Sequence, residues 1–494
     1  MNKRWTAALL FAVLCLCALS AQALTMTGLE TETVERIWAA NKFFARMEAL
    51  TGIAVEPTGI AQQEEYDTML EQMMKGDIQT DVLFKAGLTR AQEKALLESG
   101  ALIDLSQLID AHMPNLSALL AAHPEWRDVI TLEDGRIASL PLINEKERQA
   151  VLWINKAWLD QLGIAMPATL DELGAALMAI ASGDPNGNGK ADEVGAELIG
   201  VYEMRWLLPY FGIVADDYHL ARNDAGEIVF APELPAYRDF IALLRDWNDR
   251  GVLPEDAFTR VHATAMLSSA DEDAPVTSGL LLSVTPYTHL NADVVVNYVP
   301  LLLAGPDGTV RWRDVLGAVW TGCFAVTSRC ADPAQALAWV DALYSEEGAL
   351  LGYAGVQDED YTMNEQGYWS FGVQGNQDVS ALRSEVLMYT GVTMPGIYPA
   401  DFVHRVDSPL DRHVFAASEK VRAVSERVTQ PYCLGEKDQA RANELAAQIG
   451  KLVDEGIARF ATGEIELSDE QYDAWIAQLK EAGSEELTGL FAGE

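Results

Sequence analysis

The sequence predicts an α/β protein built as two lobes, and three observations support this architecture. The chain has 494 residues, whereas a single hydrophobic core rarely grows beyond about 250–300 residues. Its first part alternates helical and strand-like segments, which is typical of an α/β lobe with a largely parallel sheet. Proline and glycine are scattered singly. No flexible linker therefore separates the lobes, and we expect several short crossovers between them.

Hydrophobic periodicity and turn residues place the individual elements. Gly163 ends one helix, and Thr169 with Glu172 three residues later forms a capping box for the next. The predicted order is a helix over 30–50, a strand at 53–55, a helix over 66–74, a strand at 80–84, a strand at 151–155 and a helix over 156–163. We expect the first crossing between the lobes near residues 150–156.

The chain is strongly acidic, with 74 Asp and Glu against 35 Lys and Arg and a formal net charge of −39. Nucleic-acid binding needs basic side chains that displace counterions from phosphates. Anionic lipid attracts the same basic groups. The composition therefore argues against both kinds of partner, and a hydrophobic fraction of 49% excludes a disordered acidic tail protein.

Residues 1–23 predict a secretory signal peptide cleaved after Ala23. A basic start at residues 2–4 precedes an apolar run from Ala7 to Leu19, and Ala21-Gln22-Ala23 has the A-x-A pattern of a cleavage site. The run is shorter than the roughly 20 residues that a membrane helix needs. We therefore expect an exported protein, located outside the cell, in the cell envelope or in the periplasm.

The cysteines indicate neither a lipid anchor nor a disulfide framework. Cys15 and Cys17 each follow a leucine, where a lipoprotein signal needs a small residue, so we expect no lipid anchor. Removal of the signal leaves Cys323, Cys330 and Cys433. The first two flank a strand-like segment, and an extended chain holds them too far apart for a disulfide. Buried free thiols are the simplest interpretation, although the sequence does not fix the pairing state of the three.

The segment from Asp184 to Glu193 predicts a calcium loop. Oxygens at alternate positions converge on one point when a glycine at the sixth position, here Gly189, permits a sharp turn. The expected ligands are Asp184, Asn186, Asn188, the Lys190 carbonyl, Asp192 and Glu193. Gly195 stands where the bidentate glutamate normally lies, so Glu193 is the replacement. The following residues are strand-like, which excludes a helix–loop–helix pair, and a polar turn without metal is the alternative.

Several segments, taken in order, carry a resemblance. They are Trp153–Leu159, Leu162–Ile164, Pro167–Glu172, Asp184–Glu193, Gly305–Gly308, Pro333–Ala336, Tyr344–Gly348 and Phe460–Ile465. Together they resemble the extracellular solute-binding proteins of ABC importers that take up sugars and oligosaccharides. The calcium loop is similar to that of the longer members, including alginate-binding ones.

The resemblance implies a two-lobed, type II periplasmic-binding-protein-like fold with a hinge and a ligand cleft between the lobes. Lobe one would comprise residues 24–152 plus 278–325, and lobe two residues 153–277 plus 326–494. Closure around the ligand would present a shape that a membrane permease recognises. The resemblance also implies a structural calcium ion, and we expect a monomer.

A sugar ligand offers flat C–H faces and a rim of hydroxyls, so aromatic rings and planar polar side chains are its expected contacts. Aromatic residues near strand ends and crossovers are the candidates: Trp153, Trp206, Tyr210, Tyr287 and Trp320. Tyr287 lies where maltose-binding relatives place a cleft aromatic. The alternative for each ring is a packing role.

The polar candidates flank these aromatic residues: Glu145, Arg148, Glu203 and Arg205. The alternative for each is a solvated surface charge. An acidic sugar would pair with Arg148 and Arg205, but the scarcity of basic residues favours a neutral oligosaccharide.

Two rival functions use the same features. A secreted carbohydrate-active enzyme needs two carboxylates at a fixed separation, but so many acidic residues make any pair uninformative. The sequence contains no H-E-x-x-H or G-x-S-x-G motif and no Cys–His signature, so we expect a binding protein and not an enzyme. A binding protein that feeds a membrane sensor would have the same cleft, and the sequence does not separate it from a transport component.

Overall fold

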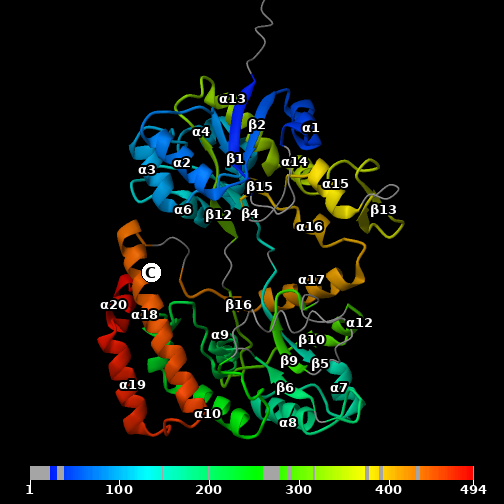
Figure 1. The fold of residues 1–494 in the computed structure, drawn as a ribbon, viewed down its shortest axis with the longest axis vertical. Helices are drawn as coiled ribbons and strands as arrows, with labels where there is room; N and C mark the ends of the chain where they lie inside the picture. Colours follow the sequence, from blue (N-terminus) through cyan, green and yellow to red (C-terminus); the bar gives the residue numbers. More distant parts are fainter. Residues whose placement is uncertain are drawn as a thin grey trace, which may run out of the picture. The chain divides into compact units, whose positions relative to one another are not determined.

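A computed structural model describes residues 23–30, 38–146, 148–190, 192–198, 200–259, 278–286, 292–314, 318–372, 378–388, 393–429 and 434–492. The predicted signal peptide up to residue 22, Tyr287 and Cys433 lie outside these ranges. The chain divides into two units (Figure 1). Unit 1 contains the residues up to Ile143, 319–364 and 370–399, and unit 2 contains 144–318, 365–369 and 400–494.

Unit 1 is built on a six-stranded sheet of order β15-β4-β12-β3-β1-β2. Its strands are β1 (Leu24–Leu29), β2 (Val55–Ile60), β3 (Val82–Phe84), β4 (Leu140–Ile143), β12 (Val319–Val326) and β15 (Gly396–Ile397). β12 is antiparallel to both β3 and β4, and the other neighbours are parallel. Pro57 is accommodated because β2 lies at the edge of the sheet, where a missing backbone N–H costs no ladder bond.

Helices cover both faces of this sheet. They are η1 (Trp38–Ala40), α1 (Lys42–Thr51), α2 (Gln63–Met74), α3 (Arg90–Glu98), α4 (Leu108–His112), α5 (Pro114–Ala122), α6 (Pro124–Ile130), α13 (Pro333–Asp341), η5 (Ala342–Tyr344), α14 (Glu346–Tyr353) and α15 (Val379–Val386). Side chains alternate along β3. Leu83 packs with Leu70 of α2 and Leu96 of α3, whereas Phe84 contacts Trp339 of α13 at a ring distance of 5.6 Å. The two faces therefore have separate packing partners.

Unit 2 contains a four-stranded sheet of order β10-β5-β9-β6. Its strands are β5 (Val151–Asn155), β6 (Val194–Glu197), β9 (Ser278–Ser283) and β10 (Tyr298–Pro300). β6 and β9 are parallel, and β5 is antiparallel to β9 and β10. Three small ribbons accompany the sheets: β7 (Leu220–Arg222) with β8 (Ile228–Phe230), β11 (Trp312–Arg313) with β16 (Ser425–Glu426), and β13 (Tyr361–Met363) with β14 (Trp369–Phe371).

The helices of unit 2 are α7 (Lys156–Gln161), α8 (Leu170–Ala181), α9 (Gly200–Met204), η2 (Arg205–Phe211), η3 (Ala231–Glu233), α10 (Pro235–Asp249), α12 (Ala292–Val295), α16 (Ala400–Val403), α17 (Pro409–Arg422), α18 (Glu436–Ala461), α19 (Asp469–Glu481) and α20 (Ser484–Phe491). α8 packs on β6 and β9, and α17 packs on β5 and β10. The long helix α18 packs against α10, α19 and α20. One continuous hydrophobic core joins these layers.

The predicted lobe boundaries require correction. The first crossing lies at Ile143–Asn144 instead of near residues 150–156. Residues 278–318 belong to unit 2 because β9 is hydrogen-bonded between β5 and β6. Residues 326–364 and 370–399 belong to unit 1, where β15 pairs with β4. Parallel pairing joins residues far apart in the sequence, so local patterns did not reveal either assignment.

The local predictions succeed where a segment is self-contained. β5 has the predicted bounds, and Cys323 and Cys330 are buried free thiols. Thr169 caps α8 by accepting from Glu172 N at 3.2 Å, but Glu172 Oε2 accepts from Ala168 N at 2.8 Å, so the return bond of the predicted capping box is made one residue earlier. The helix predicted over 30–50 is wrong at its start, because Glu30 follows strand β1 and α1 begins at Lys42. In the described part of the chain, no helix is both long and apolar enough to cross a membrane.

Candidate functional site

The carboxyl ends of the parallel strands in unit 1 meet at one edge of the sheet, where α/β proteins commonly bind ligands. β1, β3 and β4 end at this edge. β12 begins there because it is antiparallel to β3 and β4. The residues at the edge are therefore Glu30 after β1, the Lys85 segment after β3 and Trp320 at the start of β12.

Glu30 and Lys85 form a buried ion pair at this edge, with Lys85 Nζ 3.5 Å from Glu30 Oε1. Trp38 Nε1 donates to Glu30 Oε2 at 2.8 Å. Lys85 is fully buried and has a φ of 53°, a left-handed conformation that residues other than glycine rarely adopt and that is concentrated at functional sites. Sequence reasoning missed this pair. A lysine directly after an apolar strand was the signal that could have revealed it.

Trp320 is half-buried and lies next to an irregularity in β12. The pairing of β12 with β4 changes register between Trp320 and Phe324. Gly322 has a φ of +77°, and a Cβ there would lie 2.1 Å from the Leu88 carbonyl oxygen. Only glycine therefore permits this close approach, which sets the direction of the preceding residues.

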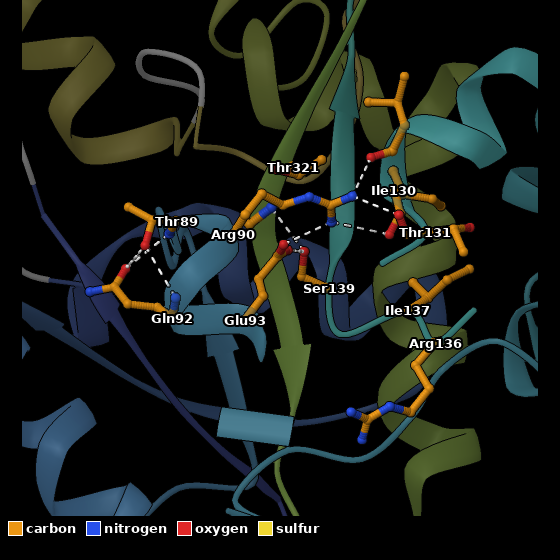
Figure 2. Close-up of polar contacts among 12 residues, drawn as sticks. Thr89, Arg90, Gln92, Glu93, Ile130, Thr131, Arg136, Ile137, Ser139 and Thr321 are labelled. Atoms are coloured by element: carbon orange, nitrogen blue, oxygen red, sulfur yellow. Dashed lines mark hydrogen bonds and ion pairs between the residues drawn. The ribbon is translucent and has the colours of Figure 1, made fainter. Parts of the chain in front are cut away.

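A buried polar cluster holds the irregular part of β12 in place (Figure 2). Glu93 of α3 is fully buried and accepts hydrogen bonds from Ser139 Oγ and, at 2.8 Å, from Arg90 Nη1. Gly322 N in turn donates to Ser139 Oγ at 2.8 Å. Burial raises the pKa of the Glu93 carboxyl, and the Arg90 charge opposes that rise.

Arg90 is anchored on its other side by backbone oxygens. Its Nη2 donates to the carbonyl of Val129 near the end of α6 at 2.7 Å, and to the carbonyl of Thr131 just beyond α6 at 2.8 Å (Figure 2). The cluster therefore ties α3, α6 and β12 together beside Trp320.

Unit 2 has a corresponding edge. β6 and β9 end there, and β5 begins there because Val151 pairs with Ser283. Three segments consequently meet at this edge: α9 after β6, residues 284–286 after β9, and Arg148 before β5.

Tyr202 in α9 is 43% exposed. The Arg205 and Arg313 guanidinium carbons lie 5.5 Å and 5.9 Å from the centre of its ring, within the range of cation–π attraction. Both arginines are buried, and Arg313 forms an ion pair with the exposed carboxylate of Asp217. The Tyr202 ring is therefore accessible to solvent, and two buried guanidinium groups lie close to it. Sequence reasoning chose Trp206 and Tyr210 of the same stretch and missed Tyr202, although Tyr202 alone follows a strand end so closely.

Three of the predicted ligand aromatics are core residues, which corrects the prediction for them. Trp153, Trp206 and Tyr210 are at most 1% exposed in the core of unit 2. Trp153 Nε1 donates to the Ser283 carbonyl at 2.9 Å, and Tyr210 Oη donates to the Leu301 carbonyl at 2.8 Å. Their ring faces contact protein, so none is available to a sugar. Tyr287 lies outside the described residues.

The predicted polar candidates have mixed positions. Glu145 is exposed and Glu203 is buried. Arg148 contacts the Phe415 ring at 4.2 Å and forms an ion pair with Asp411 at 3.3 Å.

Arg205 is 8% exposed and serves an internal cluster, which corrects its prediction as a direct ligand contact. Its Nη1 donates to His219 Nδ1 at 2.9 Å, and its Nε lies 4.0 Å from Asp454 Oδ1. Burial, reinforced by the charges of Arg205 and Arg313, places the pKa of His219 well below its usual value. Arg205 thus supports the Tyr202 ring from the protein interior, and it is not exposed for direct ligand contact.

The predicted calcium loop is folded on itself by its own oxygens. Asp184 Oδ1 and Oδ2 accept from the backbone N–H groups of Asn188 and Gly189, both at 3.0 Å. Asn188 Nδ2 donates to Asp192 Oδ2 at 3.0 Å. Within the described ranges, no three acidic, histidine or cysteine side chains form a metal-binding group.

One atom of this loop still indicates a cation. Glu193 is 7% exposed, and its Oε2 has no hydrogen-bond partner among the described residues. Its Oε1 is 3.4 Å from Asn186 N. A buried carboxylate oxygen without a partner is costly, and a loop of carboxylate and amide oxygens is the ligand type that calcium prefers. The residues present therefore fit a calcium ion.

Comparison with known proteins agrees with this architecture. No known sequence-family profile matches the chain. The fructooligosaccharide ABC transporter substrate-binding protein FusA from Streptococcus pneumoniae serotype 4 is 28% identical over 331 residues, which are 65% of this chain and 60% of FusA. The match thus spans less than two thirds of that relative.

Solved structures resemble almost the whole chain. FusA in complex with kestose has a TM-score of 0.68 at 20% identity and covers 96% of this chain and 98% of FusA. The chain has the solute-binding-protein fold. An HMO-binding solute-binding protein from Bifidobacterium longum infantis shares this fold with a TM-score of 0.76 at 20% identity, covering 95% of this chain and 98% of the other.

The alginate-binding protein AlgQ2, solved without calcium ion, also shares the solute-binding-protein fold, with a TM-score of 0.65 at 19% identity over 96% of this chain and 98% of AlgQ2. A FusA variant described as an EF-hand mutant has a TM-score of 0.67 at 20% identity over 96% of this chain and 98% of that one. FusA, a relative with this fold, thus has an EF-hand.

Proposed function

We propose that this chain is the extracellular substrate-binding component of an ABC importer, and that it binds a neutral oligosaccharide without cleaving it and delivers it to a membrane permease. The fold and the sequence match to FusA support this assignment. The chain would be exported by its signal peptide, act as a monomer and carry no lipid anchor. Enclosure of the ligand by two lobes remains a prediction.

The observation that carries the proposal is the placement of Tyr202. An exposed aromatic ring at the carboxyl edge of a sheet offers a flat apolar face for a sugar ring. The two guanidinium groups near the ring limit its motion, so little side-chain entropy is lost when a ligand binds. Asp217 is exposed beside Arg313 and would accept hydrogen bonds from sugar hydroxyls.

In unit 1, Trp320 would supply the second aromatic contact, at the same sheet edge as the buried Glu30–Lys85 ion pair. Trp320 is the one predicted aromatic of the described set that is not enclosed by core residues. Glu145 and Arg148 would lie at the rim of the site.

The charge pattern favours a neutral ligand. Arg148 pairs with Asp411, Arg205 lies near Asp454 and Arg313 pairs with Asp217. These three arginines thus each have a carboxylate neighbour. A ligand carboxylate would have to displace an existing partner, whereas hydroxyls can share these groups.

Calcium would be held by Asp184, Asn186, Asn188, the Lys190 carbonyl, Asp192 and Glu193. The bound ion would neutralise the three carboxylates of the loop and occupy the partnerless oxygen of Glu193. Its role would be structural, because the loop precedes β6 and thereby fixes the strand that leads to Tyr202.

Calorimetric titration of the full chain with kestose, nystose and maltotriose tests the proposal. We expect saturable binding of at least one sugar, with the sugar recovered intact. Tyr202→Ala should weaken that binding about tenfold, whereas Tyr202→Phe, which keeps the ring, should preserve it. Hydrolysis of the sugar would establish the enzyme alternative, and unchanged affinity of Tyr202→Ala would remove Tyr202 from the site.

A further inference from the structure

Unit 2 contains a pocket of about 520 Å³ at the far end of η2 from Tyr202. Phe211 at the end of η2 and Pro306 in the loop before β11 form part of its wall. Its size lies within the range of small-molecule sites in proteins. The pocket residues come from four separate stretches of chain that the fold brings together.

The pocket has an apolar wall that is fixed in position. Phe211 is half-buried, and its ring meets the Phe240 ring edge to face at 6.0 Å. Val428 and Val214, which also line the pocket, are nearly buried. This wall offers a rigid surface for the C–H face of a small ring.

The polar lining is balanced in charge. Arg222, Arg311 and Arg427 line the pocket together with Asp224, Asp307 and Glu426. The whole chain, by contrast, has 74 acidic and 35 basic residues. Arg311 bridges two of the acids, at 2.7 Å from Asp307 and 3.4 Å from Glu426. The pocket is therefore enriched in arginine without being electropositive.

These polar groups are held in fixed orientations. Arg222 Nη1 donates to the Gly226 carbonyl at 2.9 Å, and Asp307 Oδ1 accepts from Thr309 N at 2.9 Å. Arg427 Nη2 donates to Asp314 at 2.5 Å. Guanidinium and carboxylate groups that are already oriented bind a ligand with little further ordering cost.

The geometry points to a second carbohydrate-binding site, in which this pocket accepts one neutral, hydroxyl-rich ring. Guanidinium donors and carboxylate acceptors both line the pocket together with Phe211, which suits hydroxyls that both donate and accept. The balanced charge gives no preference to an anion. Neither Tyr202 nor Arg205 or Arg313 lines this pocket, so the pocket and the Tyr202 surface have no residue in common among the described ones.

Saturation-transfer NMR with glucose, fructose and glucuronate, applied to the full chain carrying Tyr202→Ala, tests this inference. The background substitution removes the sugar platform proposed above. We expect glucose or fructose to bind in the millimolar range, and Arg311→Ala to weaken that binding at least tenfold. The matched control is Arg441→Ala, because Arg441 also bridges two carboxylates, Glu486 at 2.7 Å and Glu444 at 2.8 Å, but lies on α18 outside the pocket.

Equal weakening by both arginine substitutions, or binding that neither alters, would overturn the second site. Stronger binding of glucuronate than of glucose would overturn its neutral ligand class. No binding of any of the three probes would also refute it. Asp307→Asn, which keeps the side-chain shape, guards against a misfolded variant and should weaken binding in the same direction. None of these outcomes depends on whether kestose, nystose or maltotriose binds at Tyr202.

Discussion

Each unit buries a charged cluster beside the aromatic residue that we assign to the ligand, but the two clusters are completed differently. In unit 1, Glu93 is paired with Arg90 and also bonded to Ser139. In unit 2, Arg205 donates to His219, but its Nε lies 4.0 Å from Asp454 Oδ1, too far for a hydrogen bond. Among the described residues, Arg205 Nε and Asp454 Oδ1 have no hydrogen-bond partner.

The difference shows two ways of supporting a binding surface. A satisfied network fixes one conformation, and removing any member leaves the others buried and unpaired. An incompletely satisfied network loses less stability when one member is removed. It also responds more readily to protonation or to a bound ion. We therefore expect the position of Trp320 to depend on an intact Glu93–Arg90 ion pair. The surroundings of Tyr202 should instead change with pH and with bound ions.

The largest expected effect comes from breaking the unit 1 network. Glu93→Ala should destabilise unit 1 by about 3–5 kcal/mol, because Arg90 loses its buried partner. Calorimetric unfolding, with separate transitions assigned to the two units, measures this. A loss below about 1 kcal/mol would contradict the importance of the network for unit 1.

The isosteric variant Glu93→Gln tests the direction in which the stability of unit 1 changes with pH. Burial raises the pKa of Glu93, so between the unfolded and folded pKa values the folded chain binds more protons. Unit 1 of the natural chain should therefore gain stability as the pH falls through the folded pKa of Glu93. Glu93→Gln should lack this gain, and parallel pH profiles of the two proteins would refute the assignment.

Chelation tests a second buried group of unit 2 that lacks a hydrogen-bond partner, the Glu193 carboxylate. At a hundredfold excess over its dissociation constant, calcium contributes about 2.7 kcal/mol of stability. EDTA should therefore lower the unfolding temperature of unit 2, and Glu193→Gln should reduce that shift. Identical melting curves with and without EDTA, together with no metal by elemental analysis, would exclude the calcium site.

Protonation of His219 should give a smaller effect. Its folded pKa lies well below the usual 6.5, so below pH 6.5 the unfolded chain binds the proton and the folded chain does not. Stability should then fall with decreasing pH by up to ~1.4 kcal/mol per unit. Burial raises the pKa of Asp216 to about 6 and raises that of Asp454, which acts in the opposite direction.

The variant His219→Asn isolates the histidine from these carboxyls. Asparagine tolerates the positive φ of 60° at this position, so the backbone can be retained. The difference in pH slope between the two proteins reports His219 alone, and equal slopes would show that His219 is not the responsive group.

The smallest effect is expected for a surface arginine. Arg441→Ala removes two exposed ion pairs on α18, and such pairs contribute little because water and salt screen them. The urea midpoint of unit 2 should stay within experimental error. A clear shift would show that exposure is a poor guide to the importance of these clusters.

The sequence predicted what depends on neighbouring residues. Strand β5, the cap at Thr169 and the free thiols Cys323 and Cys330 follow from local spacing. The class of fold followed from the alternation of helices and strands and from the resemblance, and solved structures confirm it.

The sequence failed where the outcome depends on long-range pairing. Helical spacing cannot distinguish a tryptophan enclosed in the core, such as Trp206, from an exposed tyrosine one turn earlier, such as Tyr202. Lys85 and Glu30 meet only because β1 and β3 are parallel neighbours. Their pairing was invisible before the order of strands in the sheet was known.

The division of the chain also has a consequence for its synthesis. β15 completes the sheet of unit 1 by pairing Gly396 with Leu142, and α18, which begins at Glu436, packs within unit 2. Neither unit can therefore finish folding until most of the polypeptide has been made. Contacts between such distant residues slow folding. Slow folding would favour the export that the sequence predicts, because an unfolded chain can pass through a translocation channel.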